Sequence, residues 1–145
     1  MCGIVGYVGT QNASDVLLAG LKKLEYRGYD SCGIATLNNG SLNIIKTTNR
    51  IDGLVSESKN LGYANIGIGH TRWATHGGVT EKNAHPHVSN DKKIVLVHNG
   101  IIENYITLRE MLKNKGYKFY SETDTEVIPN LISMYYKGDI LKAVK

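Results

Sequence analysis

The order of strand-like and helix-like segments is the feature that most constrains the fold of this chain. The chain opens on a run of small and β-branched residues at 3–8, which predicts a buried strand led by Cys2. A helical pattern follows at 12–26, and strands and helices continue to mix without a regular β–α–β alternation. We therefore expect an α+β layered fold.

Local signals predict the remaining elements. Asn38-Asn39-Gly40 separates two strand patterns and indicates a hairpin, because Asn and Gly tolerate positive φ. Thr123 and Glu126 fit a capping box for a helix in which Pro129 should bend the axis or reset the start. Further helices are expected at 51–59, at 103–115 and from 139 onward, and further strands at 32–37, 41–47, 65–70 and 94–98.

Composition restricts the class of protein. Hydrophobic residues make up 41% and charged residues 21% of the 145 positions, which is typical of a globular protein. No apolar run approaches the roughly 18 residues that cross a bilayer, and the opening is a poor signal peptide, so we expect a cytoplasmic protein with no membrane contact. The lysines and arginines behind the net charge of +4 are scattered, so no nucleic-acid partner is expected. The 2 cysteines make no disulfide framework.

Cys2 is the first candidate for chemistry. Taken alone, a cysteine before Gly and a strand is more often a buried structural thiol. If Met1 is excised, as is usual before a small second residue, Cys2 carries both a thiol and a free α-amino group. Their reference pKa values, about 8.5 and about 8, are close enough for the amine to take the thiol proton near neutral pH. Nucleophile and base would then belong to one residue, without a separate histidine.

A second candidate cluster runs from His70 to Gly78. A strand is expected to end near His70, so residues 72–78 should project from it as a mobile loop. Arg72 would hold a carboxylate in a bidentate fork, and Trp73 on a glycine hinge would form a lid over a small site. Either residue alone is more often a surface arginine or a core tryptophan.

Two further segments extend the candidate site. Asn99-Gly100 lies where a strand pattern gives way to a helical one, so a side-chain amide and a backbone N–H would point at one oxygen, as in an oxyanion hole. The ordinary alternative for Asn-Gly is a turn. Asp124 lies at a helix start, where the helix dipole alone accounts for acidic residues, but it would also pair with an ammonium group.

His85-Pro86-His87 requires a check for a metal site. Two histidines alone do not make one, and Cys2 has another role, so hydrogen bonding within the loop is favoured over zinc. We expect no metal.

Together these segments resemble the class II, N-terminal-nucleophile glutamine amidotransferases. The opening Cys2-Gly3-Ile4-Val5-Gly6 is similar to the start shared across that class. Four other segments look more specifically like the glutaminase domain of the glucosamine-6-phosphate synthase family, namely Tyr26–Ser31, His70–Gly77, His98–Tyr105 and Thr123–Val127. Trp73 after the arginine separates this family from the amidophosphoribosyltransferases, in which tyrosine is usual.

The resemblance implies a fold and a reaction. The fold would be the four-layer αββα sandwich of N-terminal-nucleophile hydrolases, incomplete in this chain. Residues 1–145 would be a glutaminase domain truncated on its C-terminal side. Cys2 would attack the side-chain amide of L-glutamine, and Asn99 with Gly100 would stabilise the oxyanion. No cofactor is implied.

The resemblance also implies binding roles and partners. Arg72 would bind the α-carboxylate of glutamine and Asp124 its α-ammonium group. Trp73 would belong to the loop that closes over glutamine, Thr75 and His76 would line the pocket, and Arg27 would support the surroundings of the nucleophile. In the full-length enzyme, expected to be a homodimer, ammonia would reach an isomerase domain, absent here, that converts fructose 6-phosphate to glucosamine 6-phosphate.

Two alternatives remain open. One is another class II amidotransferase domain, which Trp73 and segment 26–31 disfavour. The other is an inactive glutamine-binding fragment, because missing strands would leave the pocket unsupported. Cys32 stands where the family usually has a small residue such as alanine, and we expect this second thiol to be inert.

Overall fold

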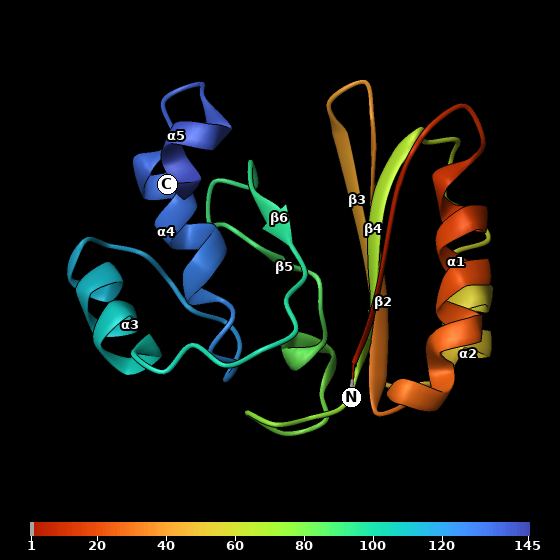
Figure 1. The fold of residues 1–145 in the computed structure, drawn as a ribbon, viewed down its shortest axis with the longest axis horizontal. Coiled ribbons are helices and arrows are strands. Elements are labelled where there is room, and N and C mark those ends of the chain that lie inside the picture. The colour runs from red at the N-terminus through yellow and green to blue at the C-terminus, as the bar shows by residue number, and fades with distance from the viewer. Residues whose placement is uncertain (1) are drawn as a thin grey trace.

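The structure is a computed structural model that describes residues 2–145. The expected excision of Met1 concerns a residue outside this range. Figure 1 shows four successive layers, which are a pair of helices, a four-stranded sheet, a small two-stranded sheet and a second group of helices. This arrangement confirms the predicted α+β fold and its αββα layering.

The first two layers form one lobe and the last two form another. The first lobe contains β1 (Gly3–Val8), α1 (Ala13–Leu24), a 3₁₀ turn (Glu25–Arg27), β2 (Ser31–Asn38), β3 (Ser41–Thr47), α2 (Ile51–Glu57) and β4 (Ile66–Arg72). The second lobe contains a 3₁₀ turn (Glu81–Asn83), β5 (His87–Val88), β6 (Val95–Leu96), α3 (Tyr105–Asn114), α4 (Val127–Tyr135) and α5 (Ile140–Val144).

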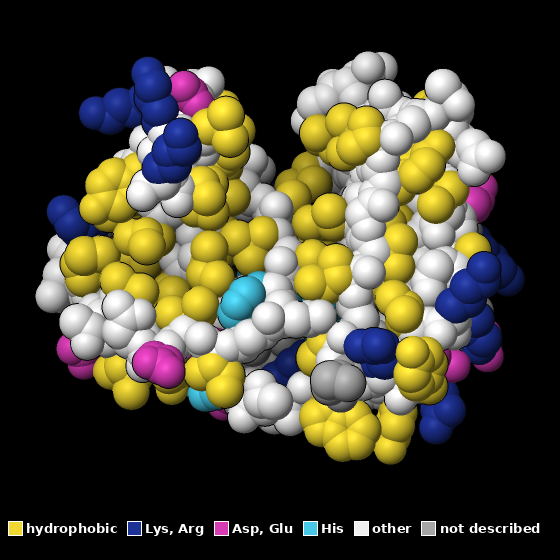
Figure 2. Space-filling model, in the orientation of Figure 1, with side chains coloured by type: hydrophobic (Ala, Val, Ile, Leu, Met, Phe, Trp, Pro, Cys, Tyr) yellow, Lys and Arg dark blue, Asp and Glu magenta, His cyan; other side chains and the backbone are white. Residues whose placement is uncertain are grey.

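The large sheet has the strand order β1-β4-β2-β3, and neighbouring strands are antiparallel. Side chains alternate between its two faces, so each face is a separate layer contact. One face packs on α1 and α2 in a buried core made of Leu17, Leu21, Cys32, Ile34, Ile51 and Leu54. The other face turns toward the second lobe, and Figure 2 shows apolar side chains along the hollow between the lobes.

Two local predictions are confirmed. The hairpin between β2 and β3 turns at Asn39 and Gly40, whose φ angles are +47° and +80°. α4 begins at Val127, so Pro129 lies in its first turn and resets the helix start instead of bending the axis. The ring is tolerated there because a backbone N–H in the first turn has no partner within the helix.

The predicted ends of two strands are wrong. β4 does not stop near His70 but runs to Arg72, because Arg72 still pairs with Ser31 of β2. The strand expected at 94–98 is reduced to the two residues of β6. Beyond its end, the His98 N–H donates to Nδ1 of His85, 3.4 Å away. This N–H therefore bonds to a side chain and does not pair with a neighbouring strand.

The predicted capping box between Thr123 and Glu126 is also wrong. The Glu126 carboxylate accepts from the backbone N–H groups of Tyr120 and Ser121 at 2.9 and 2.8 Å. It therefore closes the turn before the helix, and α4 has no side-chain cap. Local spacing alone could not distinguish these two uses of one carboxylate.

The lobes meet where the loop before β5 crosses the large sheet. A Cβ atom added to Gly33 of β2 would lie 2.3 Å from the His85 carbonyl oxygen and 2.9 Å from that of Ile45. Lys46 of β3 reinforces the contact, because its Nζ donates to the Ala84 carbonyl at 2.8 Å. The absence of a side chain at Gly33 thus permits the two layers to touch.

Three buried histidines lie at this junction. The rings of His70 and His85 stack at 4.1 Å with planes 15° apart, and His87 meets His85 edge-on at 4.6 Å. Burial lowers the pKa of His70 to about 4 and that of His87 to about 3, and it lowers the pKa of His85 further. All three imidazoles are therefore neutral near pH 7.

We predict that Gly33→Ala destabilises the fold by about 1–3 kcal/mol or more, because the new methyl group overlaps backbone atoms that cannot swing aside. Urea unfolding gives the free energy of unfolding directly. Gly6→Ala on β1 is the matched control, because a Cβ there has no atom within 4 Å. Equal losses in the two variants would show that the layers do not touch at Gly33.

Acid should also destabilise the fold through the histidines. Unfolded histidines titrate near pH 6.5, whereas these three stay neutral when folded, so the unfolded state binds more protons below that pH. The free energy of unfolding should therefore fall as the pH drops from 7 to 5, with a limiting slope of about 1.4 kcal/mol per pH unit for each histidine. His87→Gln keeps a side-chain donor near Thr123 but removes one titrating group. It should therefore lower the slope of the free energy of unfolding against pH by up to the contribution of one proton, about 1.4 kcal/mol per pH unit. A pH-independent free energy of unfolding over this range would contradict the neutral, buried state.

Candidate active site

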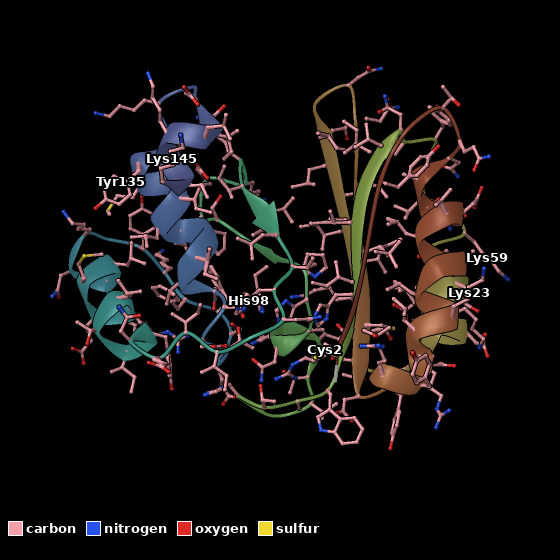
Figure 3. All side chains as sticks on the ribbon, in the orientation of Figure 1. Cys2, Lys23, Lys59, His98, Tyr135 and Lys145 are labelled. Atoms are coloured by element: carbon pink, nitrogen blue, oxygen red, sulfur yellow. The ribbon has the colours of Figure 1, made fainter. Side chains whose placement is uncertain are left out.

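A pocket of about 330 Å³ opens at the junction of the two lobes, beside the start of β1. In Figure 3, Cys2 and His98 approach this junction from opposite lobes. The volume lies at the lower end of the range of about 300–1,000 Å³ that is usual for small-molecule sites. All nine residues named from the sequence line it, namely Cys2, Arg27, Arg72, Trp73, Thr75, His76, Asn99, Gly100 and Asp124.

Cys2 is held at the end of β1 by the end of β4. The two strands pair so that Gly3 is opposite Thr71, and the Gly3 N–H donates to Thr71 Oγ1 at 3.0 Å. The backbone N–H of Trp73 then donates to Cys2 Sγ at 3.1 Å. The Cys2 thiol also lies 3.6 Å from the Trp73 carbonyl, so the sulfur contacts both polar groups of the Trp73 backbone.

The segment after β4 is fixed by the turn that precedes β2. Asp30 Oδ2 accepts from the Ala74 N–H at 2.7 Å, and the Asp30 N–H donates to the Arg72 carbonyl at 3.2 Å. Gly28 packs against the same backbone, since a Cβ there would lie 2.8 Å from the Arg72 carbonyl carbon. Asp30 is thus a residue that aims the Trp73 N–H, and residue pattern alone did not single it out.

Arg72 differs from its predicted position. It is the last residue of β4, only 3% exposed, and does not project on a loop. Its guanidinium donates to the carbonyl oxygens of Gly78 (3.0 Å), Gly77 (3.4 Å) and His76. The hydrogen bonds of the arginine therefore hold the loop 76–78 in a curve around the guanidinium group. Trp73, next to it in the chain, lines the pocket and is 47% exposed.

Asn99 lies against the nucleophile residue. Its Nδ2 donates to the Cys2 carbonyl at 3.1 Å, and its Oδ1 lies 2.8 Å from Nε2 of His70. His70 is fully buried on β4, and no role in the site was predicted for it, although it begins the second candidate cluster. The amide donor of the pocket, Asn99, thus comes from the second lobe, and His70, which contacts its oxygen, comes from the first lobe.

Asp124 is a buried residue of the pocket lining. Its Oδ2 accepts from the Ile102 N–H at 2.7 Å, which ties the turn before α4 to the loop that carries Gly100. Its other oxygen has only a long contact of 3.4 Å with Thr125 Oγ1. One carboxylate oxygen therefore keeps acceptor capacity toward the pocket, of which Asp124 forms part of the lining.

The remaining three predicted residues also line the pocket. Arg27 Nε donates to the Tyr26 hydroxyl at 3.1 Å, so this hydrogen bond joins Arg27 to its neighbour in the chain and not to Cys2. The His76 ring meets Tyr105 of α3 edge-on at 5.7 Å. Thr75 is exposed at the pocket edge.

Cys32 lies apart from this pocket, in the core beneath α1 and α2. Burial raises the pKa of its thiol to about 12, and the nearby Glu25 and Glu57 act in the same direction. Its Sγ donates to the Asn49 carbonyl at 3.4 Å. The second thiol is therefore protonated and enclosed.

The two histidines around Pro86 form hydrogen bonds, although with residues outside their own loop. Nδ1 of His85 accepts from the His98 N–H, and Nε2 of His87 lies 2.9 Å from Thr123 Oγ1. Over residues 2–145, no three His, Cys, Asp or Glu side chains are grouped so as to hold a metal ion. Within the same range, no helix has the length and apolar character needed to cross a membrane.

The sequence and the fold both have known relatives. The family model described as a glutamine amidotransferase domain matches residues 57–143. The glutamine–fructose-6-phosphate aminotransferase (isomerizing) of Clostridium acetobutylicum is 59% identical over 145 residues, covering 99% of this chain and 24% of the relative. The protein of the same name from Clostridium perfringens is 57% identical over 147 residues, again covering 99% of this chain and 24% of the relative. The chain thus spans about a quarter of the length of these relatives.

A solved structure has the same architecture. The glutamine phosphoribosylpyrophosphate amidotransferase of B. subtilis superposes with a TM-score of 0.83 at 25% identity, covering 99% of this chain and 31% of that one. Taken with the family match and the close relatives, this similarity shows that the chain belongs to the glutamine amidotransferase domain family and has the fold of the N-terminal-nucleophile amidotransferases.

Proposed function

We propose that this chain hydrolyses the side-chain amide of L-glutamine to glutamate and ammonia, with Cys2 as the nucleophile. The observation that carries the proposal is the convergence on one pocket of nine residues named from the sequence, six for their chemistry and three through the family resemblance. They come from both lobes and from segments as far apart in the chain as Cys2 and Asp124. Release of ammonia from glutamine is the general function of glutamine amidotransferase domains.

The first step forms a thioester. The α-amino group of Cys2, free once Met1 is removed, takes the thiol proton, and Sγ attacks the amide carbon of glutamine. The Trp73 N–H stabilises the thiolate from 3.1 Å. The charge that develops on the amide oxygen is met by Asn99 Nδ2, which has a second hydrogen beyond the one donated to Cys2, and by the Gly100 N–H.

The second step releases the products. The ammonium group of Cys2 returns its proton to the leaving nitrogen, so the C–N bond breaks and ammonia departs. Water then attacks the thioester, with the same α-amine taking its proton. The C–S bond breaks, glutamate leaves and the thiol is restored.

The two charges of the amino acid have separate partners in this proposal. The free oxygen of Asp124 accepts from the α-ammonium group. Arg72 has donors beyond the three that hold the loop carbonyls, and they are available to the α-carboxylate. Trp73 closes the rim, while Thr75 and His76 complete the wall and Arg27 supports the nucleophile's surroundings.

The longer protein is the next part of the proposal. Because the named relatives are aminotransferases about four times as long, we infer that residues 1–145 are the N-terminal part of a glutaminase domain in such an enzyme. Its ammonia would serve an isomerase domain in the same polypeptide that makes glucosamine 6-phosphate from fructose 6-phosphate. A cytoplasmic homodimer without nucleic-acid or membrane partners belongs to the same proposal.

A diazo-ketone analogue of glutamine should modify Cys2 and spare Cys32. Cys2 lines the glutamine pocket, whereas the thiol of Cys32 is enclosed and has a raised pKa. Peptide mapping of the labelled protein locates the adduct. Cys32→Ala should label at the wild-type rate, and an adduct found mainly on Cys32 would refute the assignment of the nucleophile.

Asp124→Asn should raise KM for glutamine by about 10–100-fold, because the amide still accepts from the Ile102 N–H but loses the negative charge. The variant should also lose much of the preference for glutamine over its desamino analogue, as steady-state ammonia release measures. Glu110→Gln removes an exposed carboxylate of α3 and is the charge-matched control. Equal losses with both substrates would assign Asp124 a purely structural role.

A further inference from the structure

His70 is a buried ionisable group that contacts a pocket residue and that the proposed mechanism does not use. It is 0% exposed on β4, and its Nε2 lies 2.8 Å from Asn99 Oδ1. Asn99 itself is exposed, so packing does not fix the orientation of its amide. Hydrogen bonds alone must decide which end of that amide faces Cys2.

The partners of Asn99 determine its orientation. The end of the amide nearest the Cys2 carbonyl is 3.1 Å away, and only an N–H group is attractive to a carbonyl oxygen at that distance. A flipped amide would set two acceptors against each other. The Asn99 oxygen must therefore face His70, and His70 must present a hydrogen to it.

A neutral imidazole has one N–H, so the contact also fixes the tautomer. The hydrogen lies on Nε2, and Nδ1 is the bare nitrogen. Among residues 2–145, Nδ1 has no partner with good hydrogen-bond geometry, although the backbone of His98 lies near enough to the ring to act against the lowering of the His70 pKa. That nitrogen is better left as an acceptor than as a buried, unpaired N–H donor.

The ring of His70 cannot readily turn away from Asn99. One face stacks on His85 at 4.1 Å with planes 15° apart. His85 is in turn held by the His98 N–H, immediately before Asn99 in the chain. The segment His98-Asn99 thus both holds His85 against the His70 ring and carries the amide that His70 orients.

We propose that His70 is the positioning residue of the oxyanion hole. Its Nε2–H holds Asn99 Oδ1, so that the Asn99 amino group faces the oxygen on which negative charge develops when Cys2 attacks the substrate. His70 touches neither glutamine nor the thioester, and it acts only through Asn99. This inference rests on the proposed glutaminase function.

The test is a pair of substitutions that differ by one methylene group. The amide nitrogen of glutamine reaches approximately the position of Nε2 of histidine, whereas that of asparagine reaches only the position of Nδ1. His70→Gln should keep kcat for glutamine hydrolysis within about 5-fold of the wild type, because the donor is restored. His70→Asn should lower kcat by about 10–100-fold, a large part of the usual value of one oxyanion donor, with KM changed less than about 3-fold.

A transition-state analogue separates positioning from general damage. The γ-aldehyde of glutamate adds to Cys2 and places an oxygen in the oxyanion hole, whereas glutamate itself does not. His70→Asn should weaken aldehyde inhibition by the same factor as kcat and leave glutamate inhibition unchanged. Thr36→Val, a substitution at another buried polar position of the same sheet, should leave both unchanged.

A double-mutant cycle tests the route of action. In an Asn99→Ala background, His70→Asn should cause no further loss of kcat, because the group that it positions is gone. Equal kcat in His70→Gln and His70→Asn, or full additivity with Asn99→Ala, would overturn the inference. If the unsubstituted chain binds glutamine but releases no ammonia, the proposed function fails. If it is active and both His70 variants match it, only this inference fails.

Discussion

The antiparallel pairing of β1 with the end of β4 is the constraint on which the pocket depends. It sets Gly3 opposite Thr71, so Cys2 lies beside the residue that leaves the strand, Trp73. Side chains alternate along β4, and the pairing therefore also turns His70 and Arg72 toward the second lobe. A slip of one residue would send both to the helix-covered face and remove the N–H from the sulfur. The nucleophile is positioned by backbone register more than by contacts of its own side chain.

The buried charges around the pocket are satisfied mainly by backbone groups. Arg72 is surrounded by three loop carbonyls, Asp124 accepts from one N–H, and Glu126 accepts from two. An isolated buried charge would be costly, but backbone dipoles that are already oriented need not rearrange when a substrate arrives. The zwitterion of an amino acid can then meet a cation and an anion that are already desolvated and held in place.

The sequence predicted most of this architecture because its strongest signals are local. The β2–β3 hairpin follows from Asn39 and Gly40, and the start of α4 follows from Pro129, since each acts through its own backbone angles. Six of the nine pocket residues followed from short motifs whose chemistry is legible without coordinates, whereas Arg27, Thr75 and His76 were implied only by the family resemblance. That all nine line one pocket is known only from the tertiary structure. Their individual roles are proposals.

What the sequence did not predict depends on partners far away in the chain. Arg72 extends β4 because Ser31 pairs with it, and Glu126 closes a turn instead of capping a helix because two N–H groups lie within reach. Asp30 and His70 gain their importance from Ala74 and Asn99, which are 44 and 29 positions away. No periodicity in a window of 18 residues or so can report such pairs.

The distance between nucleophile and amide donor is set at the lobe junction. Cys2 belongs to the first lobe and Asn99 to the second, and a shift of about 1 Å between them is enough to misalign a reacting pair. The backbones of the two layers lie close together at Gly33, where an added Cβ would overlap the carbonyl of His85. The His85 ring stacks on His70, which holds Asn99, so this packing contact is transmitted to the pocket through two imidazole rings. A glycine that carries no functional group thereby helps to fix the geometry in which the oxyanion would be stabilised.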